Sequence, residues 1–173
     1  MRNFQNYLES FGRKVIAGAK NNLKAIDSDL GSKMKVKVKK VGKGYEVIFT
    51  APEYAKAVDM GVNGRDNKRY YKDYLGQRRR TPGKGYTNKM PPSIIFEKWM
   101  KRKGIKGRDK KTGRFQKTKT TAFAMAKNMQ IKGRKGLEFF QKPLGLEYKK
   151  LNKNVVNAIK KDFKLQIESI KNK

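Results

Sequence analysis

The chain has 173 residues, enough for one sizeable hydrophobic core, and it carries 45 Lys and Arg against 14 Asp and Glu, a net charge of +31. It has no cysteine and no histidine, which excludes disulfide bonds, thiolate metal sites and the commonest general base of enzymes. A compact molecule with this charge repels itself, so we expect a strongly negative partner, either nucleic acid or an acidic protein surface.

The first thirty residues have the pattern of an amphipathic helix. Gly31 predicts its end, while Gly12 and Gly18 weaken it by about 1 kcal/mol each, so packing must stabilise it. No apolar run approaches the roughly 20 residues that span a bilayer, and Met1–Phe11 lacks the pattern of a signal peptide. The apolar residues recur every three or four positions on one face: Phe4, Leu8, Phe11, Val15, Ala19, Leu23, Ile26 and Leu30.

A change to alternating apolar and polar residues then predicts a β-hairpin. Residues 34–39 and 45–49 alternate with period two, and Gly42–Lys43–Gly44 between them is a turn signal. Residues 53–60 are compatible with a short helix, which Gly61 would cap.

Residues 62–92 are rich in glycine and proline and predict a long loop or extended arm, with room for a short hairpin of its own. A helix follows, with Ser93 as its expected N-cap, Gly104 as its end and Trp99 in the core. Residues 101–120 form a second basic stretch. The window 65–89 carries nine basic and two acidic residues, and 101–119 carries ten and one, so the charge is concentrated in two segments.

The last third predicts two more helices. One ends at Gly133 and is followed by Leu137, Phe139 and Phe140, which can fill the core from a loop. The other begins near Glu147, and its apolar stripe comprises Tyr148, Leu151, Val155, Ile159, Phe163, Ile167 and Ile170. The expected fold class is therefore α+β: a small antiparallel sheet packed with about four helices, in one domain, 1–173, with basic insertions at 62–92 and 101–120.

Catalytic chemistry finds little support in the sequence. The acidic residues are scattered, and only Asp59 and Asp66 flank a glycine turn near the basic loop, so a metal-dependent nuclease is disfavoured. The glycines lack the spacing of a phosphate-binding loop, and two Gly-x-x-Gly pairs give only a weak indication of a KH domain. We expect no catalytic, cofactor-binding or metal-ligating residue.

Basic and aromatic residues interleaved in the window 65–89 are the remaining chemical signal. Tyr70, Tyr71 and Tyr74 are expected to anchor the first insertion to its own or a neighbouring subunit, and we assign them to inter-subunit contacts. The expected contacts with a polyanion or an acidic partner are Arg78, Arg79, Arg80, Lys101, Arg102, Lys103, Lys106, Arg108, Lys110, Lys111 and Arg114.

Three stretches together resemble the tail-completion or head–tail joining proteins of tailed bacteriophages. The first, 53–61, is similar to a Tyr-Ala-x-x-Val-Glu-x-Gly signature, with Asp59 where that family more often has glutamate. The second, 92–105, resembles a helix with a tryptophan followed by Lys-Gly, and the third, 122–140, a helix, a basic-Gly turn and a phenylalanine. The residues that carry the resemblance are Tyr54, Ala55, Asp59, Gly61, Trp99, Gly133, Phe139 and Phe140.

The resemblance implies a non-enzymatic structural protein of the virion, in the neck or upper tail, assembled in the host cytoplasm. It implies a homo-oligomeric ring of six or twelve copies around the DNA exit channel, with portal or adaptor and tail proteins as partners. Phosphate contacts to double-stranded DNA would be non-specific and would need no base contacts. We expect no cofactor and no membrane. On this view, a neighbouring subunit orders the basic insertions, which would be flexible in a solitary chain.

Two alternatives stay open at this point. A free-standing basic nucleic-acid-binding protein, of the nucleoid or ribosome-associated type, would bind as a monomer with an affinity that falls steeply as salt rises. A DNA-processing enzyme would lose activity on substitution of Asp59 or Asp66.

Overall fold

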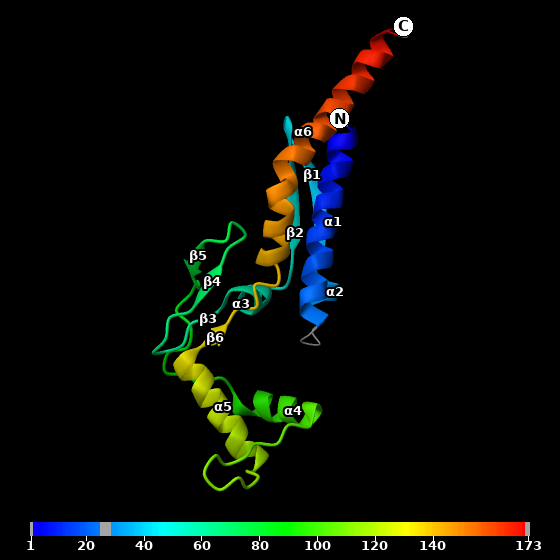
Figure 1. Ribbon diagram of the computed structural model, residues 1–173. Helices are drawn as coiled ribbons and strands as arrows, with labels where there is room; N and C mark the ends of the chain where they lie inside the picture. Colours follow the sequence, from blue (N-terminus) through cyan, green and yellow to red (C-terminus); the bar gives the residue numbers. More distant parts are fainter. Residues whose placement is uncertain (1, 25–28, 172–173) are drawn as a thin grey trace. The chain divides into compact units, whose positions relative to one another are not determined.

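The computed structural model describes residues 2–24 and 29–171, with side chains described to residue 165 (Figure 1). The fold is mixed α+β, with helices and small antiparallel two-stranded sheets, so the expected fold class is confirmed. Contacts within the chain define two compact units where the sequence predicted one domain with two insertions. Unit 1 comprises Met1–Asp59, Lys72–Arg78 and Leu137–Lys173, and unit 2 comprises Met60–Tyr71 and Arg79–Gly136.

The order of elements follows the sequence pattern closely in the first half of the chain. The helices are α1 (Arg2–Lys24), α2 (Leu30–Lys33), α3 (Ala55–Met60), α4 (Ser93–Lys103), α5 (Thr118–Lys132) and α6 (Gln141–Lys171). The strands are β1 (Lys35–Val41), β2 (Gly44–Thr50), β3 (Gly61–Val62), β4 (Tyr70–Lys72), β5 (Arg78–Arg80) and β6 (Arg134–Lys135). Strand β1 pairs with β2, β3 with β6, and β4 with β5.

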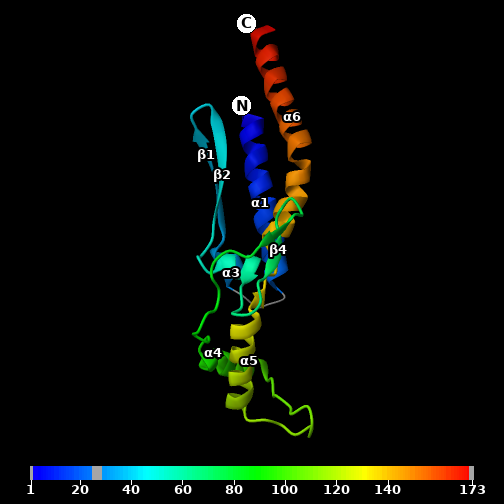
Figure 2. The same ribbon diagram turned by 90° about the vertical axis from the view of Figure 1, so that its left-hand side faces the viewer.

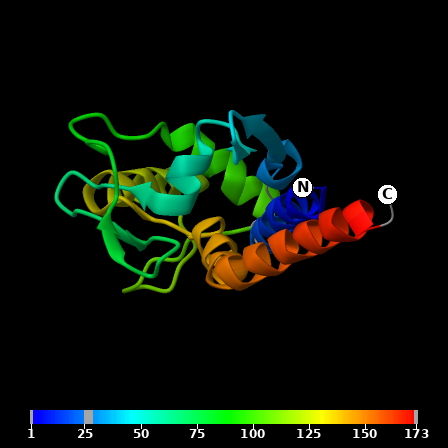
Figure 3. The same ribbon diagram turned by 90° about the horizontal axis from the view of Figure 1, so that it is seen from above.

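Unit 1 is layered: α1 lies between the β1–β2 hairpin and the antiparallel helix α6 (Figures 2 and 3). The predicted hairpin is observed, and its register sets Val36 opposite Phe49 and Val38 opposite Val47 on the more buried face. Alternate lysines therefore lie on the exposed face, as the period-two pattern predicts.

Two glycines that weaken α1 allow this close packing. A Cβ atom on Gly12 would lie 2.5 Å from Cγ2 of Val36 in β1, and one on Gly18 would lie 2.6 Å from Cβ of Pro143 in α6. Their cost in helix propensity is therefore offset by contacts on both sides of α1.

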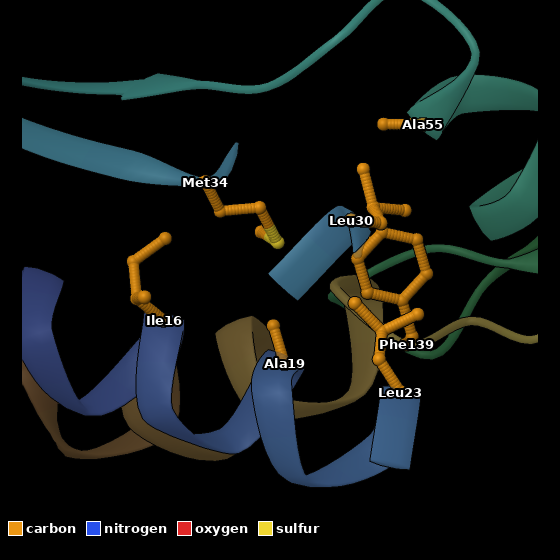
Figure 4. Close-up of a cluster of buried hydrophobic side chains, with 7 residues drawn as sticks. All are labelled: Ile16, Ala19, Leu23, Leu30, Met34, Ala55 and Phe139. Carbon is orange, nitrogen blue, oxygen red and sulfur yellow. The ribbon is translucent and has the colours of Figure 1, made fainter. Parts of the chain in front are cut away.

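The hydrophobic core of unit 1 gathers at the C-terminal half of α1 (Figure 4). Phe139, in the loop before α6, is only 2% exposed and fills the space between α1, α2 and α3, which confirms its predicted role. Leu137 and Phe140 pack against the same cluster. The buried members are Ile16, Ala19, Leu23, Leu30, Met34, Ala55 and Phe139.

A buried carboxylate ties the start of α1 to α6. Asp162 accepts hydrogen bonds from the backbone N–H groups of Asn3 and Phe4, both at 3.0 Å, and from the Asn3 amide at 3.1 Å. Burial opposes ionisation of this group, but these donors hold the pKa of the Asp162 carboxyl below its ordinary value. Asp162 therefore caps the N-terminus of α1 from another helix.

Several predicted boundaries are wrong. Gly31 does not end a helix but lies buried within α2, and Ile26, predicted on the apolar face of the first helix, falls outside the described residues. Ser93 is the first residue of α4, where Pro92 holds the N-cap position and no side chain caps the helix. Helix α6 begins at Gln141, six residues before Glu147. Gly104 and Gly133 end α4 and α5 as predicted.

Two predicted buried faces are also wrong in part. Trp99 was expected in the core but is 37% exposed, and Met100 is the buried residue of α4. On α6, Tyr148 and Phe163 are exposed, while Ala158 and Asp162 are buried. The side chains of Ile167 and Ile170 lie outside the described part. None of the helices in the described part of the chain combines the length and the hydropathy that a membrane span requires.

Candidate functional site

Unit 2 carries most of the surplus positive charge. Its 70 residues include 22 Lys and Arg and three acidic residues, a net charge of +19 out of +31. Each acidic side chain already has a partner in the unit: Asp66 pairs with Arg65 at 2.7 Å, Glu97 pairs with Lys101 at 3.0 Å, and Asp109 accepts backbone hydrogen bonds. The positive field of unit 2 is therefore largely uncompensated by its own residues.

The first basic segment is held in place by one buried asparagine. The Asn63 amide nitrogen donates to the carbonyl oxygens of Thr81 and Gly83, both at 2.9 Å, and its side-chain oxygen accepts from the Arg69 N–H at 2.8 Å. The Asn63 carbonyl accepts from the Tyr86 N–H at 3.0 Å. Asn63 thus satisfies backbone groups on both sides of the segment that the sequence predicts as a long loop.

A buried glutamine of α5 fixes the end of the same segment. The Gln130 amide nitrogen donates to the carbonyl oxygens of Thr87 and Asn88 at 3.1 and 2.9 Å. The Gln130 carbonyl accepts from the Arg65 N–H at 2.8 Å, and the Arg69 guanidinium donates to the Lys132 carbonyl at 2.6 Å. The expectation that this insertion needs a neighbouring subunit to order it is therefore wrong, because the chain itself supplies the hydrogen bonds.

The predicted residues of the first insertion lie on the hairpin of β4 and β5. Arg78, Arg79 and Arg80 form β5 and are exposed. Tyr74 makes an edge-to-face contact with Tyr148 of α6, with ring centroids 5.1 Å apart, so part of its surface is used within its own chain. The assignment of Tyr70 and Tyr71 to inter-subunit contacts stays a prediction.

The second basic segment contains a small turn structure, residues 106–116, which we call the cationic hairpin (Figure 1). Arg108 and Phe115 form an antiparallel bridge, the Asp109 N–H donates to the Arg114 carbonyl at 2.9 Å, and the Gln116 N–H donates to the Gly107 carbonyl at 2.9 Å. The hairpin brings together five of the predicted cations: Lys106, Arg108, Lys110, Lys111 and Arg114. Lys101, Arg102 and Lys103 are exposed in the last turn of α4, shortly before it in the chain.

An exposed aromatic ring lies among these cations. Phe115 is 62% exposed, with the guanidinium carbon of Arg108 4.4 Å and the ammonium nitrogen of Lys106 5.8 Å from the ring centroid. Both are cation–π distances. Phe115 was not singled out from the sequence, although the Asp-x-x-Thr-Gly turn signal at 109–113 before it predicts a tight reversal.

Asp109 holds the turn of the cationic hairpin. Its carboxylate accepts from the backbone N–H groups of Thr112 and Lys111, both at 2.9 Å, and from the Gln116 amide at 3.2 Å. These donors, of which the Thr112 N–H has the largest effect, hold the pKa of the Asp109 carboxyl below its ordinary value.

Acid is therefore expected to loosen the cationic hairpin. Because the pKa of Asp109 is lower in the folded turn, its contribution is present above the unfolded value of about 3.9 and is lost as pH falls through the folded pKa. We expect Asp109→Asn to speed amide hydrogen exchange at residues 111–116 at neutral pH, measured by NMR. The control is Asp66→Asn, which removes an exposed carboxylate of the same unit; equal protection in both variants would contradict this role.

Apolar side chains are also exposed on unit 2. Ile94, Ile95 and Trp99 lie on the outer side of α4, whereas Met100 packs inward and α4 packs against α5. An exposed apolar face beside the basic end of the helix is typical of a surface that contacts another molecule.

The residues that carry the family resemblance have mainly structural roles. The Asp59 carboxylate, at the end of α3, accepts from the Phe140 N–H at 2.8 Å and the Gln141 amide at 3.1 Å, so it caps α6. Burial raises the pKa of Asp59, and these two donors oppose that shift. Ala55 and Phe139 belong to the core, and Tyr54 is exposed.

In unit 2, two of the residues that carry the resemblance, Gly61 and Gly133, lie where two short strands pair. Gly61 opens β3 and pairs with Lys135 of β6, directly after Gly133 ends α5.

Asp59 and Asp66, the candidate acidic pair, lie in different units and have different partners. Across residues 2–24 and 29–171, no three His, Cys, Asp or Glu residues cluster so that they could hold a metal ion.

Comparison with family models, curated proteins and solved structures finds no match for this chain.

Proposed function

We propose that the protein is a non-enzymatic structural component of a tailed-bacteriophage virion, a ring-forming connector or tail-completion protein at the head–tail interface. Each copy would meet neighbouring copies, portal or adaptor proteins and tail proteins around the DNA exit channel. The observation that carries the proposal is the surface of unit 2, which combines a net charge of +19 with an exposed apolar face on α4. Such a surface favours assembly with other molecules over a solitary state.

The positions of the family-like residues support the same proposal. Asp59, at the glutamate position of the signature, joins α3 to α6 through two hydrogen bonds, and Phe139 fills the core beside it. Gly61 and Gly133 lie at the start of β3 and the end of α5. Four of the residues that carry the resemblance therefore have structural roles, whereas Tyr54 and Trp99 are exposed.

Oligomer formation tests this proposal. We expect the purified 20.0 kDa chain to form closed rings of six or twelve copies, alone or on addition of head–tail junction proteins, in sedimentation and negative-stain images. The double variant Ile95→Ser, Trp99→Ser is expected to shift the population toward monomer, because it removes apolar surface from α4. Lys98→Ser, on the same helix, is the matched control. A chain that stays monomeric in every setting would contradict the proposal.

A second candidate is a free-standing nucleic-acid-binding protein. The observation that favours it is the order of both basic segments within a single chain, through Asn63, Gln130 and Asp109. This candidate predicts tight binding by the monomer, with log affinity falling linearly with log salt concentration.

A further inference from the structure

We propose that the cationic hairpin, residues 106–116, is a binding site for nucleic acid with unpaired bases. Its lysines and arginines would neutralise phosphates, and a base would stack on the exposed ring of Phe115. The inference rests on the hairpin alone and does not require ring formation, so the two proposals can fail separately.

The geometry of Phe115 is the main argument. The ring is 62% exposed although it is wholly apolar, and two cations lie within cation–π distance of its centroid. The Arg108 guanidinium lies 4.4 Å from the centroid, so a base on the exposed part of the ring would bind beside an existing cation–π contact. Stacking of bases on aromatic side chains beside basic residues is how single strands are bound without sequence preference.

The hairpin is also preorganised for binding. The bridge between Arg108 and Phe115 and the bonds to the Asp109 carboxylate fix the backbone without a ligand. The ordering entropy of the loop is therefore largely spent on folding, and less of it opposes binding.

Other polyanions fit the hairpin less well. A duplex keeps its bases stacked on each other and would use only the cations, leaving the exposed Phe115 ring without a role. An acidic protein would also pair with the cations, but its carboxylates provide no aromatic surface that could stack on Phe115. The cations alone do not discriminate among these ligands, whereas the aromatic ring does.

Ultraviolet cross-linking tests the contact directly despite the many other cations of the chain. The full-length protein is irradiated with oligo-dT, with a mixed-sequence duplex, or with oligo-dT in the presence of polyglutamate, and cross-linked peptides are mapped by mass spectrometry. We expect a cross-link at Phe115 with oligo-dT, and a cross-link at least about tenfold weaker with the duplex. The cross-link to oligo-dT should persist when polyglutamate is added at concentrations that displace purely ionic contacts.

Variants separate stacking from folding. Phe115→Leu is expected to lower the affinity for oligo-dT about tenfold and leave duplex affinity unchanged, while Phe115→Tyr retains the π face and binds as the parent does. Phe123→Leu, an exposed phenylalanine on α5, is the control. Amide exchange at residues 108–116 checks that each variant keeps the hairpin. No cross-link at Phe115, or equal loss of single-strand and duplex binding in Phe115→Leu with the hairpin intact, would overturn the proposal.

Discussion

Replacing Phe139 with alanine is expected to lower the free energy of unfolding by about 3–5 kcal/mol. The ring is 2% exposed and joins α1, α2 and α3, so its removal leaves a cavity that the surrounding helices cannot fill. A loss of this size is a large part of the total stability of an ordinary domain. Urea denaturation followed by circular dichroism measures it.

Phe163→Ala is the matched control for this prediction. Phe163 lies on α6 and is 53% exposed, so its replacement is expected to change stability by about 0.5 kcal/mol or less. Should Phe139→Ala fail to fold, Phe139→Leu keeps most of the volume and is expected to cost clearly less. Equal effects of the substitutions at 139 and 163 would contradict the placement of Phe139 in the core.

Replacing Asn63 with alanine is expected to destabilise unit 2 by about 2–3 kcal/mol. Asn63 is 2% exposed, and its side chain makes three hydrogen bonds to the backbone of the first basic segment. Without it, the buried carbonyl of Thr81 and the N–H of Arg69 lose their partner, so amide exchange should speed up across residues 81–86. Hydrogen exchange with mass spectrometry measures this change.

Two further variants define the role of Asn63. Asn67→Ala, at an exposed position of the same segment, is expected to leave exchange at 81–86 unchanged. Asn63→Asp keeps the acceptor for Arg69 but sets carboxylate oxygens against the carbonyls of Thr81 and Gly83, so we expect it to be no more stable than the alanine variant. Normal exchange in Asn63→Ala would show that the segment is held by other contacts.

The elements that sequence analysis predicted correctly are those specified by local periodicity. The 3.6-residue stripe of α1 and the alternation of β1 and β2 are each visible within a short window of sequence, even though α1 packs against the distant helix α6 as well as the hairpin. Phe139 was predicted because it belongs to a group of three large apolar residues, Leu137, Phe139 and Phe140, that follow a glycine-rich turn and can fill the core. Boundaries were less predictable: Gly31 is accommodated within α2, and α6 includes Pro143 in its first turn, where proline needs no backbone donor.

The organisation of unit 2 could not be read from periodicity. Its basic segments are held by Asn63 and Gln130, whose partners lie about 20 and 40 residues away, and no local pattern marks an amide as buried. The burial of Trp99 was predicted wrongly for a different reason. An apolar helix face is usually core, but on α4 the packing side is set by Met100 and the partner helix α5, so Trp99 is left partly exposed.

Sequence analysis predicted where the positive charge of the candidate surface lies, but not the geometry of the cationic hairpin. The eleven predicted cations are all in or beside the two basic segments, because an excess of lysine and arginine is visible without a structure. Phe115 was missed, since its significance depends on the bridge that places it opposite Arg108.

A reconstruction of the intact virus particle by electron cryo-microscopy tests the proposed structural role most directly. We predict that this chain is found between head and tail as one closed ring of six or twelve copies, with unit 2 against neighbouring protein or DNA. Particles that are complete and infectious without the chain, or a chain bound only to nucleic acid outside the particle, would contradict the account.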